Sequence, residues 1–147
     1  MPIGICTPQR RQATHAVRAA AAVALAAASS AVSAHHSINA VYDGARQQRI
    51  EGVVAEFQFV NPHPFVIVTV EAEGSGESWR LEMDNRFELA GVGMTSATLK
   101  PGDRVVVTGS PGRTEPRTLY IRQLDRPADG FRYEQVGSRP RVNTEQR

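Results

Sequence analysis

Hydrophobic and polar residues alternate along several short stretches of this chain, a spacing typical of β-strands with one buried face. The first stretch begins at Ile50 and directs these residues to one face: Val53, Ala55, Phe57 and Phe59. The Asn-Pro-His-Pro run at 61–64 ends it, because proline has no amide hydrogen for a neighbouring strand. Residues 65–73 are apolar on both faces, which predicts a central strand.

A hairpin and one short helix are predicted next. The glycines of 74–76 turn the chain, and the following strand directs three residues inward: Trp79, Leu81 and Met83. Asn85 and Glu88 have the spacing of a capping box, so a helix should begin there and stop at Gly91. Its expected apolar contacts are Phe87, Leu89 and Ala90.

Two further strands complete the predicted fold. Pro101-Gly102 is typical of a type II turn, with strands expected after it at 105–107 and at 118–124. About five strands with one short helix predict a mainly β fold, namely a small OB-like five-stranded barrel. A split barrel or a sandwich is the alternative architecture.

The N-terminal third has a different composition, which predicts an export signal. A basic start with three arginines precedes the uncharged, alanine-rich run 19–34, and these are the parts of a secretory signal peptide. We expect cleavage after Ala34, with cleavage after Ala31 as the competitor. The expected organisation is a signal peptide (1–34), an N-terminal arm (35–48), the OB-like domain (49–131) and a polar, disordered tail (132–147).

Cleavage after Ala34 would change the charge and redox chemistry of the chain. Lysine plus arginine falls from 17 to 14 while all 15 acidic residues remain, so the net charge changes from +2 to −1. A domain of this charge has no general attraction for nucleic acid. The single cysteine, Cys6, is also removed. We therefore expect a periplasmic or secreted protein without a membrane span, whose protein partner the sequence does not name.

Several short motifs recur together in this chain. They are Ala-His-His-Ser at 34–37, Tyr-Asp at 42–43, Asn-Pro-His at 61–63, a tryptophan in the third strand and Leu-Lys-Pro-Gly-Asp at 99–103. In this combination the sequence resembles a family of small exported bacterial proteins that contain a domain of unknown function. The resemblance covers about residues 34–131 and implies a periplasmic, mostly β domain, with no established activity.

The three remaining histidines suggest a metal site. If His35 becomes the N-terminal residue, its α-amine and ring can chelate one ion, and a second imidazole opposite completes a three-nitrogen histidine brace. Such a nitrogen set suits Cu(II). His63, in a stiff loop, is the natural partner, and His36 is its substitute.

Three other polar residues are candidates for the surroundings of such a site. Asp43 or Glu82 could add an axial oxygen or hold a ligand in place, and Asn61 lies two residues before His63. Each candidate has a plainer interpretation: His63 as a loop residue bonded to nearby backbone, Asn61 as a turn residue, and the N-terminal histidines as solvated side chains.

Enzyme activity is not expected. The mature chain has no cysteine, and no serine lies in a Gly-x-Ser-x-Gly elbow. The leading hypothesis is therefore an exported protein that binds one copper ion. The alternative is a metal-free periplasmic β domain that binds another ligand or serves as a scaffold.

Overall fold

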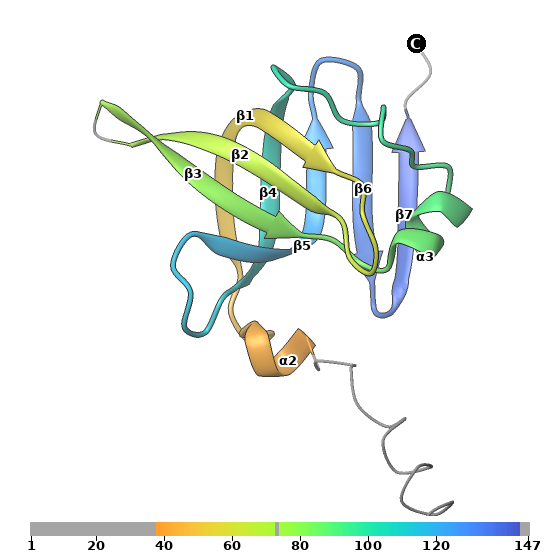
Figure 1. Ribbon diagram of the computed structural model, residues 1–147, viewed down its shortest axis with the longest axis horizontal. Coiled ribbons are helices and arrows are strands. Elements are labelled where there is room, and N and C mark those ends of the chain that lie inside the picture. The colour runs from red at the N-terminus through yellow and green to blue at the C-terminus, as the bar shows by residue number, and fades with distance from the viewer. Residues whose placement is uncertain (1–37, 73, 145–147) are drawn as a thin grey trace, which may run out of the picture. The chain divides into compact units, whose positions relative to one another are not determined.

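Seven strands and two short helices form the part of the chain that the computed structural model describes, residues 38–72 and 74–144 (Figure 1). In chain order the elements are α2 (Ile38–Val41), β1 (Gln48–Gln58), β2 (Phe65–Ala72), β3 (Ser75–Glu82), α3 (Arg86–Gly91), β4 (Arg104–Pro111), β5 (Thr118–Arg126), β6 (Phe131–Val136) and β7 (Arg139–Thr144).

The first five strands close into a barrel. The sheet order is β3-β2-β1-β4-β5-β6-β7, and β3 also pairs with β5. This closing pair is parallel and short: Arg80, Leu81 and Glu82 lie opposite Thr118, Leu119 and Tyr120. These three pairs join β3 to β5 and so close the five-stranded part of the sheet on itself. The predicted mainly β, OB-like five-stranded barrel with one short helix between its third and fourth strands is confirmed.

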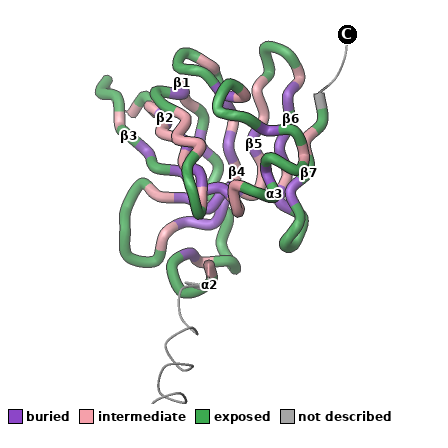
Figure 2. Tube along the Cα trace, turned by 45° about the vertical axis from the view of Figure 1, so that its right-hand side comes forward, coloured by how far each residue is buried: buried purple, intermediate pink, exposed green. Residues whose placement is uncertain are grey.

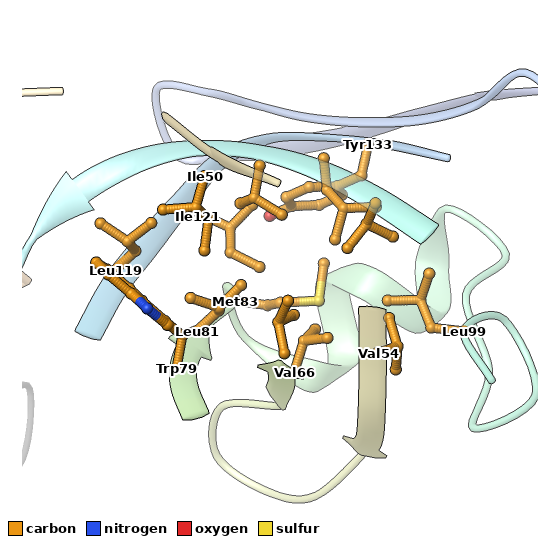
Figure 3. Close-up of a cluster of buried hydrophobic side chains, with 14 of the residues drawn as sticks. Ile50, Val54, Val66, Trp79, Leu81, Met83, Leu99, Leu119, Ile121 and Tyr133 are labelled. Carbon is orange, nitrogen blue, oxygen red and sulfur yellow. The ribbon is translucent and has the colours of Figure 1, made fainter. Parts of the chain in front are cut away.

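The core lies inside this barrel. Figure 3 shows Met83 among side chains from several strands, and Figure 2 shows that buried positions gather on the strands while the loops are mostly exposed. The residues predicted to point inward from the third strand do so, since Leu81 and Met83 are fully buried and Trp79 is 9% exposed. The predicted central strand, β2, lies between β3 and β1.

The prediction for the first strand was wrong over its first half. Ile50 and Val54 are the buried residues of β1, whereas Val53 is half-buried and Ala55 is exposed. The pairing with β2 shifts between Val54 and Glu56. A β-bulge adds one residue and reverses which side chains face the core beyond it. The inward alternation predicted from Phe57 and Phe59 therefore does not hold for Val53 and Ala55, which lie before or at the bulge.

The helix begins as predicted, because the side chain of Asn85 accepts a hydrogen bond from the amide of Phe87 at 2.8 Å. Leu89 is buried as expected. Phe87 is not, since it remains 71% exposed. A helix of six residues presents one narrow face to the barrel, and Phe87 lies outside that face.

The predicted disordered tail at 132–147 was also wrong over its described part. β6 and β7 form an antiparallel hairpin in which Val136 pairs with Arg139. Tyr133 is fully buried, and Gly137 takes a φ of 62° in the two-residue turn. The low apolar content of this segment did not prevent β7 from pairing with β6. An outer strand needs few buried side chains, because its backbone is hydrogen-bonded to the neighbouring strand.

The beginning of the predicted arm is placed only from residue 38 onward. The expected signal peptide at 1–34, with its cleavage site, lies outside the described residues, as do His35 and His36. Within the described ranges, no helix combines the length and the apolar character that crossing a bilayer requires.

Candidate functional site

His63 lies in the loop between β1 and β2, which is hydrogen-bonded to the chain where β3 leads into α3. The amide of Met83 donates to the carbonyl of Pro64 at 2.9 Å, and the amide of Arg86 donates to the carbonyl of Pro62 at 3.0 Å. The Asn61–Pro62 peptide bond is cis. These contacts hold the loop against the end of β3.

The ring of His63 is oriented by one hydrogen bond. Its Nδ1 lies 3.2 Å from the carbonyl oxygen of Met83. Because a carbonyl oxygen can only accept, Nδ1 carries the hydrogen in this contact and the lone pair of the neutral ring is on Nε2. The side chain is 28% exposed, so it is held from one side while remaining open to solvent.

Glu82 connects this histidine to the N-terminal arm. Its Oε1 lies 3.7 Å from Nδ1 of His63, and its Oε2 accepts a hydrogen bond of 2.7 Å from the hydroxyl of Tyr42. The Glu82 side chain is 16% exposed. Burial first, and then the hydrogen bond to Glu82, raise the pKa of Tyr42, so the phenol stays protonated and continues to donate.

The arm is fixed by the connection between β4 and β5, residues 112–117. Arg113 donates from its amide to the carbonyl of Val41 at 2.9 Å and from its Nε to the carbonyl of Asn39 at 3.0 Å. Its Nη2 lies 3.7 Å from Oδ1 of Asp43. We call Arg113, together with Tyr42 and its partner Glu82, the arm clamp.

A second polar group lies beside the arm clamp. The rings of Tyr42 and Tyr120 are 5.8 Å apart between centroids, and Tyr120 is buried. Burial, followed by the nearby charge of Asp84, raises the pKa of Tyr120. Asp84 accepts a hydrogen bond from Nε2 of Gln135, whose Oε1 accepts from the buried hydroxyl of Tyr133. The end of β3 is therefore surrounded by ordered polar side chains.

The structure brings together two of the residues predicted from sequence, His63 and Glu82. Asp43 does not join them, because its carboxylate accepts from the amide of Ala45 at 3.2 Å and faces Arg113. The exposed Asn61 makes no side-chain hydrogen bond within the described chain. Across residues 38–72 and 74–144, no group of three His, Cys, Asp or Glu side chains could hold a metal ion.

Sequence reasoning missed Tyr42, Arg113 and Tyr120. Tyr42 had a signal, since it belongs to the Tyr-Asp motif of the resemblance, but its partner Glu82 is 40 positions away. Arg113 and Tyr120 stand in a loop and a strand whose neighbours depend on barrel closure, and no local pattern identifies them.

A surface pocket of about 410 Å³ lies elsewhere, lined in part by Asp125, Arg126 and Arg132. Its charged groups are paired with one another or with near neighbours. Arg126 contacts Asp103 at 2.6 Å and Asp129 at 2.8 Å, and Arg132 contacts Asp125 at 2.6 Å. None of the residues around His63 lines this pocket, so it is separate from the candidate site.

Fold and site together define a small barrel protein with an arm clamped beside a half-buried histidine. A family model matches residues 21–119, and the chain belongs to this family, a family of unknown function (DUF6152). The match includes the arm clamp and the loop of His63, while β6 and β7 follow it.

Comparison with other proteins adds little beyond the family. No curated protein matches the chain. Among solved structures, the chain is similar to TiaS in a complex with a tRNA and ATP, at 17% identity and a TM-score of 0.41, covering 72% of this chain and 30% of the other. It is also similar to apo TiaS, a tRNA agmatidine synthetase, at 17% identity and a TM-score of 0.39, covering 69% and 30%. The chain thus spans less than a third of the length of these proteins.

Proposed function

We propose that this chain is an exported protein of the periplasm that binds one copper ion through an N-terminal histidine brace. The observation that supports it best is the orientation of His63. Its Nδ1 donates to the carbonyl of Met83, which leaves Nε2 for a metal. Metal-binding histidines in proteins usually donate their second ring N–H to a carbonyl or carboxylate in this manner.

The other ligands in this proposal come from the start of the mature chain. Cleavage after Ala34 makes His35 the first residue, so its α-amine and ring nitrogen chelate the ion while His63 binds opposite, with His36 as the substitute. Seven positions separate His35 from the fixed Tyr42, and because four of the residues between them form α2, the segment spans at most about 17 Å. Because Tyr42 is hydrogen-bonded to the carboxylate beside His63, this reach favours the assignment.

Glu82 has a supporting role in this proposal. Its carboxylate lies on the Nδ1 side of the ring, 3.7 Å away, rather than on the side of the metal-binding nitrogen. A negative charge there makes the imidazole a better donor to a cation. We assign copper carriage or buffering to the protein rather than catalysis, since the mature chain offers no thiol nucleophile and the proposed ligand set holds a single ion.

The test is the intact mass of the exported protein under native conditions, with and without Cu(II). We expect a mature chain that starts at His35 and carries one copper ion. In His63→Ala the affinity for copper should fall at least about 100-fold, beyond the 10–100-fold typical of residues that only support a ligand. Val60→Ala is the matched control, because this side chain lies in the same loop, is 48% exposed and cannot bind a metal.

Two outcomes would overturn the proposal. One is a mature protein that starts at His35 and holds no copper, which would leave a metal-free ligand-binding or scaffold domain. The other is a His63→Ala protein that binds copper as tightly as its parent. An extra alanine placed before His35 keeps every imidazole but displaces the chelating amine, so it should weaken binding as well.

A further inference from the structure

We propose that the surface pocket at the turn between β5 and β6 binds a neutral, polyhydroxylated ligand, namely a few sugar units of a glycan. The pocket has a volume of about 410 Å³. The turn that borders it lies at the end of the barrel away from α3 (Figure 1). The residues that line it are separate from those around His63, so this inference goes beyond the proposed function and does not depend on copper binding.

Three polar side chains form one row across the wall of the pocket. Asp125 of β5 lies opposite Arg132 of β6, and Arg132 lies opposite Asn143 of β7. All three residues line the pocket. Cross-strand partners of this kind project from the same face of a sheet, about 5 Å apart. The row therefore presents a carboxylate, a guanidinium and an amide side by side.

The chemistry of this row suits hydroxyl groups. A carboxylate only accepts hydrogen bonds, a guanidinium only donates them, and an amide does both. The side chain of Asn143 is exposed, and it makes no hydrogen bond to another described residue. A hydroxyl group can donate and accept at the same time. A ligand with adjacent hydroxyls, such as a sugar ring, can therefore complement all three side chains.

The charged groups of the pocket already have opposite charges beside them, which argues against an ionic ligand. Nε of Arg132 donates to Oδ1 of Asp125 at 2.6 Å. Arg126, which also lines the pocket, pairs with Asp103 at 2.6 Å and with Asp129 at 2.8 Å. An anion or a cation would have to compete with these ion pairs for its counter-charge, whereas a neutral ligand can bond to both members of a pair.

Hydrogen bonds around the pocket hold its walls in place. The second carboxylate oxygen of Asp125 accepts from Nε2 of Gln123 at 2.6 Å, so both of its oxygens are fixed. At the turn, the carboxylate of Asp129 accepts from the amide of Phe131 at 3.2 Å as well as from Arg126. Side chains that are already ordered lose little conformational entropy when a ligand binds.

Two further depressions extend the pocket around the same turn, so a ligand longer than one ring can lie there. One, of about 380 Å³, shares Pro127 with the pocket, and the other, of about 290 Å³, shares Arg126 with it. Both depressions are lined by the exposed Ala128. Pro127 is also exposed, and its apolar ring can contact the C–H face of a sugar. This continuity favours a glycan chain over a single small polyol.

The test measures binding of three neutral trisaccharides, cellotriose, maltotriose and chitotriose, by nuclear magnetic resonance of the ¹⁵N-labelled protein. We expect saturable binding of at least one of them, with the shift changes concentrated at the amides of Gly130, Arg132 and Asn143, which line the pocket. Trigalacturonate, an anionic trisaccharide, should bind at least about 10-fold more weakly, because the lining arginines are ion-paired.

Two variants and a matched control locate the site. Asn143→Ala should weaken binding of the neutral sugar about 5-fold, the loss expected for one hydrogen bond. Asp125→Asn removes the counter-charge of Arg132, so it should weaken binding of the neutral sugar and strengthen binding of trigalacturonate. The control is Arg141→Ala, because Arg141 lies two residues from Asn143 on the same strand but does not line the pocket. Its affinity should equal that of the parent.

Three outcomes would overturn the inference: none of the neutral sugars binds, trigalacturonate binds more tightly than they do, or Asn143→Ala binds as tightly as the parent. Copper enters none of these measurements. Failure of the sugar site therefore leaves the proposed copper function standing, and a protein that binds no copper leaves the sugar site standing.

Discussion

Every tyrosine of this chain is buried, so alkaline pH should destabilise the protein by an amount that the structure allows to be calculated. The chain has three: Tyr42 is 4% exposed, Tyr120 is 3% exposed and Tyr133 is fully buried. In each case burial is the largest cause that raises the pKa of the phenol. The folded protein therefore keeps all three protons at pH values where an unfolded chain loses them.

The sign and size follow from linkage. A raised pKa in the folded state means that the stabilisation is complete below the unfolded pKa of about 10 and is lost as pH rises above it. At a pH of about 11, each phenol that ionises only after unfolding costs about 1.4 kcal/mol, and the three together cost about 4 kcal/mol. This is a large fraction of the roughly 5–15 kcal/mol that stabilises a typical domain.

The assay combines urea unfolding between pH about 9 and 11.5 with the near-ultraviolet absorbance of phenolate. The free energy of unfolding should fall by up to about 4 kcal/mol for each pH unit above 10, and phenolate should appear together with the loss of circular dichroism. Interference is small because Lys100 is the single lysine. Reversible ionisation of the tyrosines near pH 10 in a protein that keeps its native spectrum would refute the reasoning.

Three further predictions concern the fold. A Cβ at Gly52 would lie 2.4 Å from the carbonyl oxygen of Thr69, so Gly52→Ala should lower the free energy of unfolding in urea by about 2–3 kcal/mol. The control is Gly91→Ala: Gly91 is helical and its Cβ would meet no atom within 4 Å, so this change should be neutral or stabilise the protein by up to about 1 kcal/mol. Deletion of residues 137–147 removes β7 and should destabilise the protein by several kcal/mol, about the cost of exposing a large buried side chain; a disordered tail would be lost without effect. The hydrogen bond from Arg126 lowers the pKa of Asp129. The stabilisation from this ion pair is therefore complete above about pH 4 and is lost in acid. Asp129→Asn should reduce the loss of stability in acid by less than about 1 kcal/mol, because the pair is partly exposed.

Much of the barrel could be predicted from sequence because its signals are local. The Asn85 cap and the inward alternation from Trp79 to Met83 each occupy a few adjacent residues, and the structure contains both. The failures came where a neighbouring strand decided the outcome. The bulge after Val54 exists in the pairing with β2, and β7 is stabilised by its ladder to β6 rather than by its own apolar residues.

The candidate site was predictable to a smaller extent for a related reason. Histidines are few, so His63 was conspicuous, and Glu82 could be named as a candidate although no spacing linked the two. Their neighbour Tyr42 is 40 positions from Glu82, and contacts at that separation follow from how the sheet closes. Sequence could thus identify the candidate residue types but not the arm clamp that orders them.

Barrel closure and the candidate site depend on the same few residues. The pairing of β3 with β5 has three residue pairs, the last of which joins Glu82 to Tyr120, and Tyr42 contacts both members of that pair. The arm therefore covers the shortest ladder of the barrel at the point nearest to His63. A change that released the arm would uncover this closing pair, so we expect packing of the arm and closure of the barrel to be thermodynamically coupled.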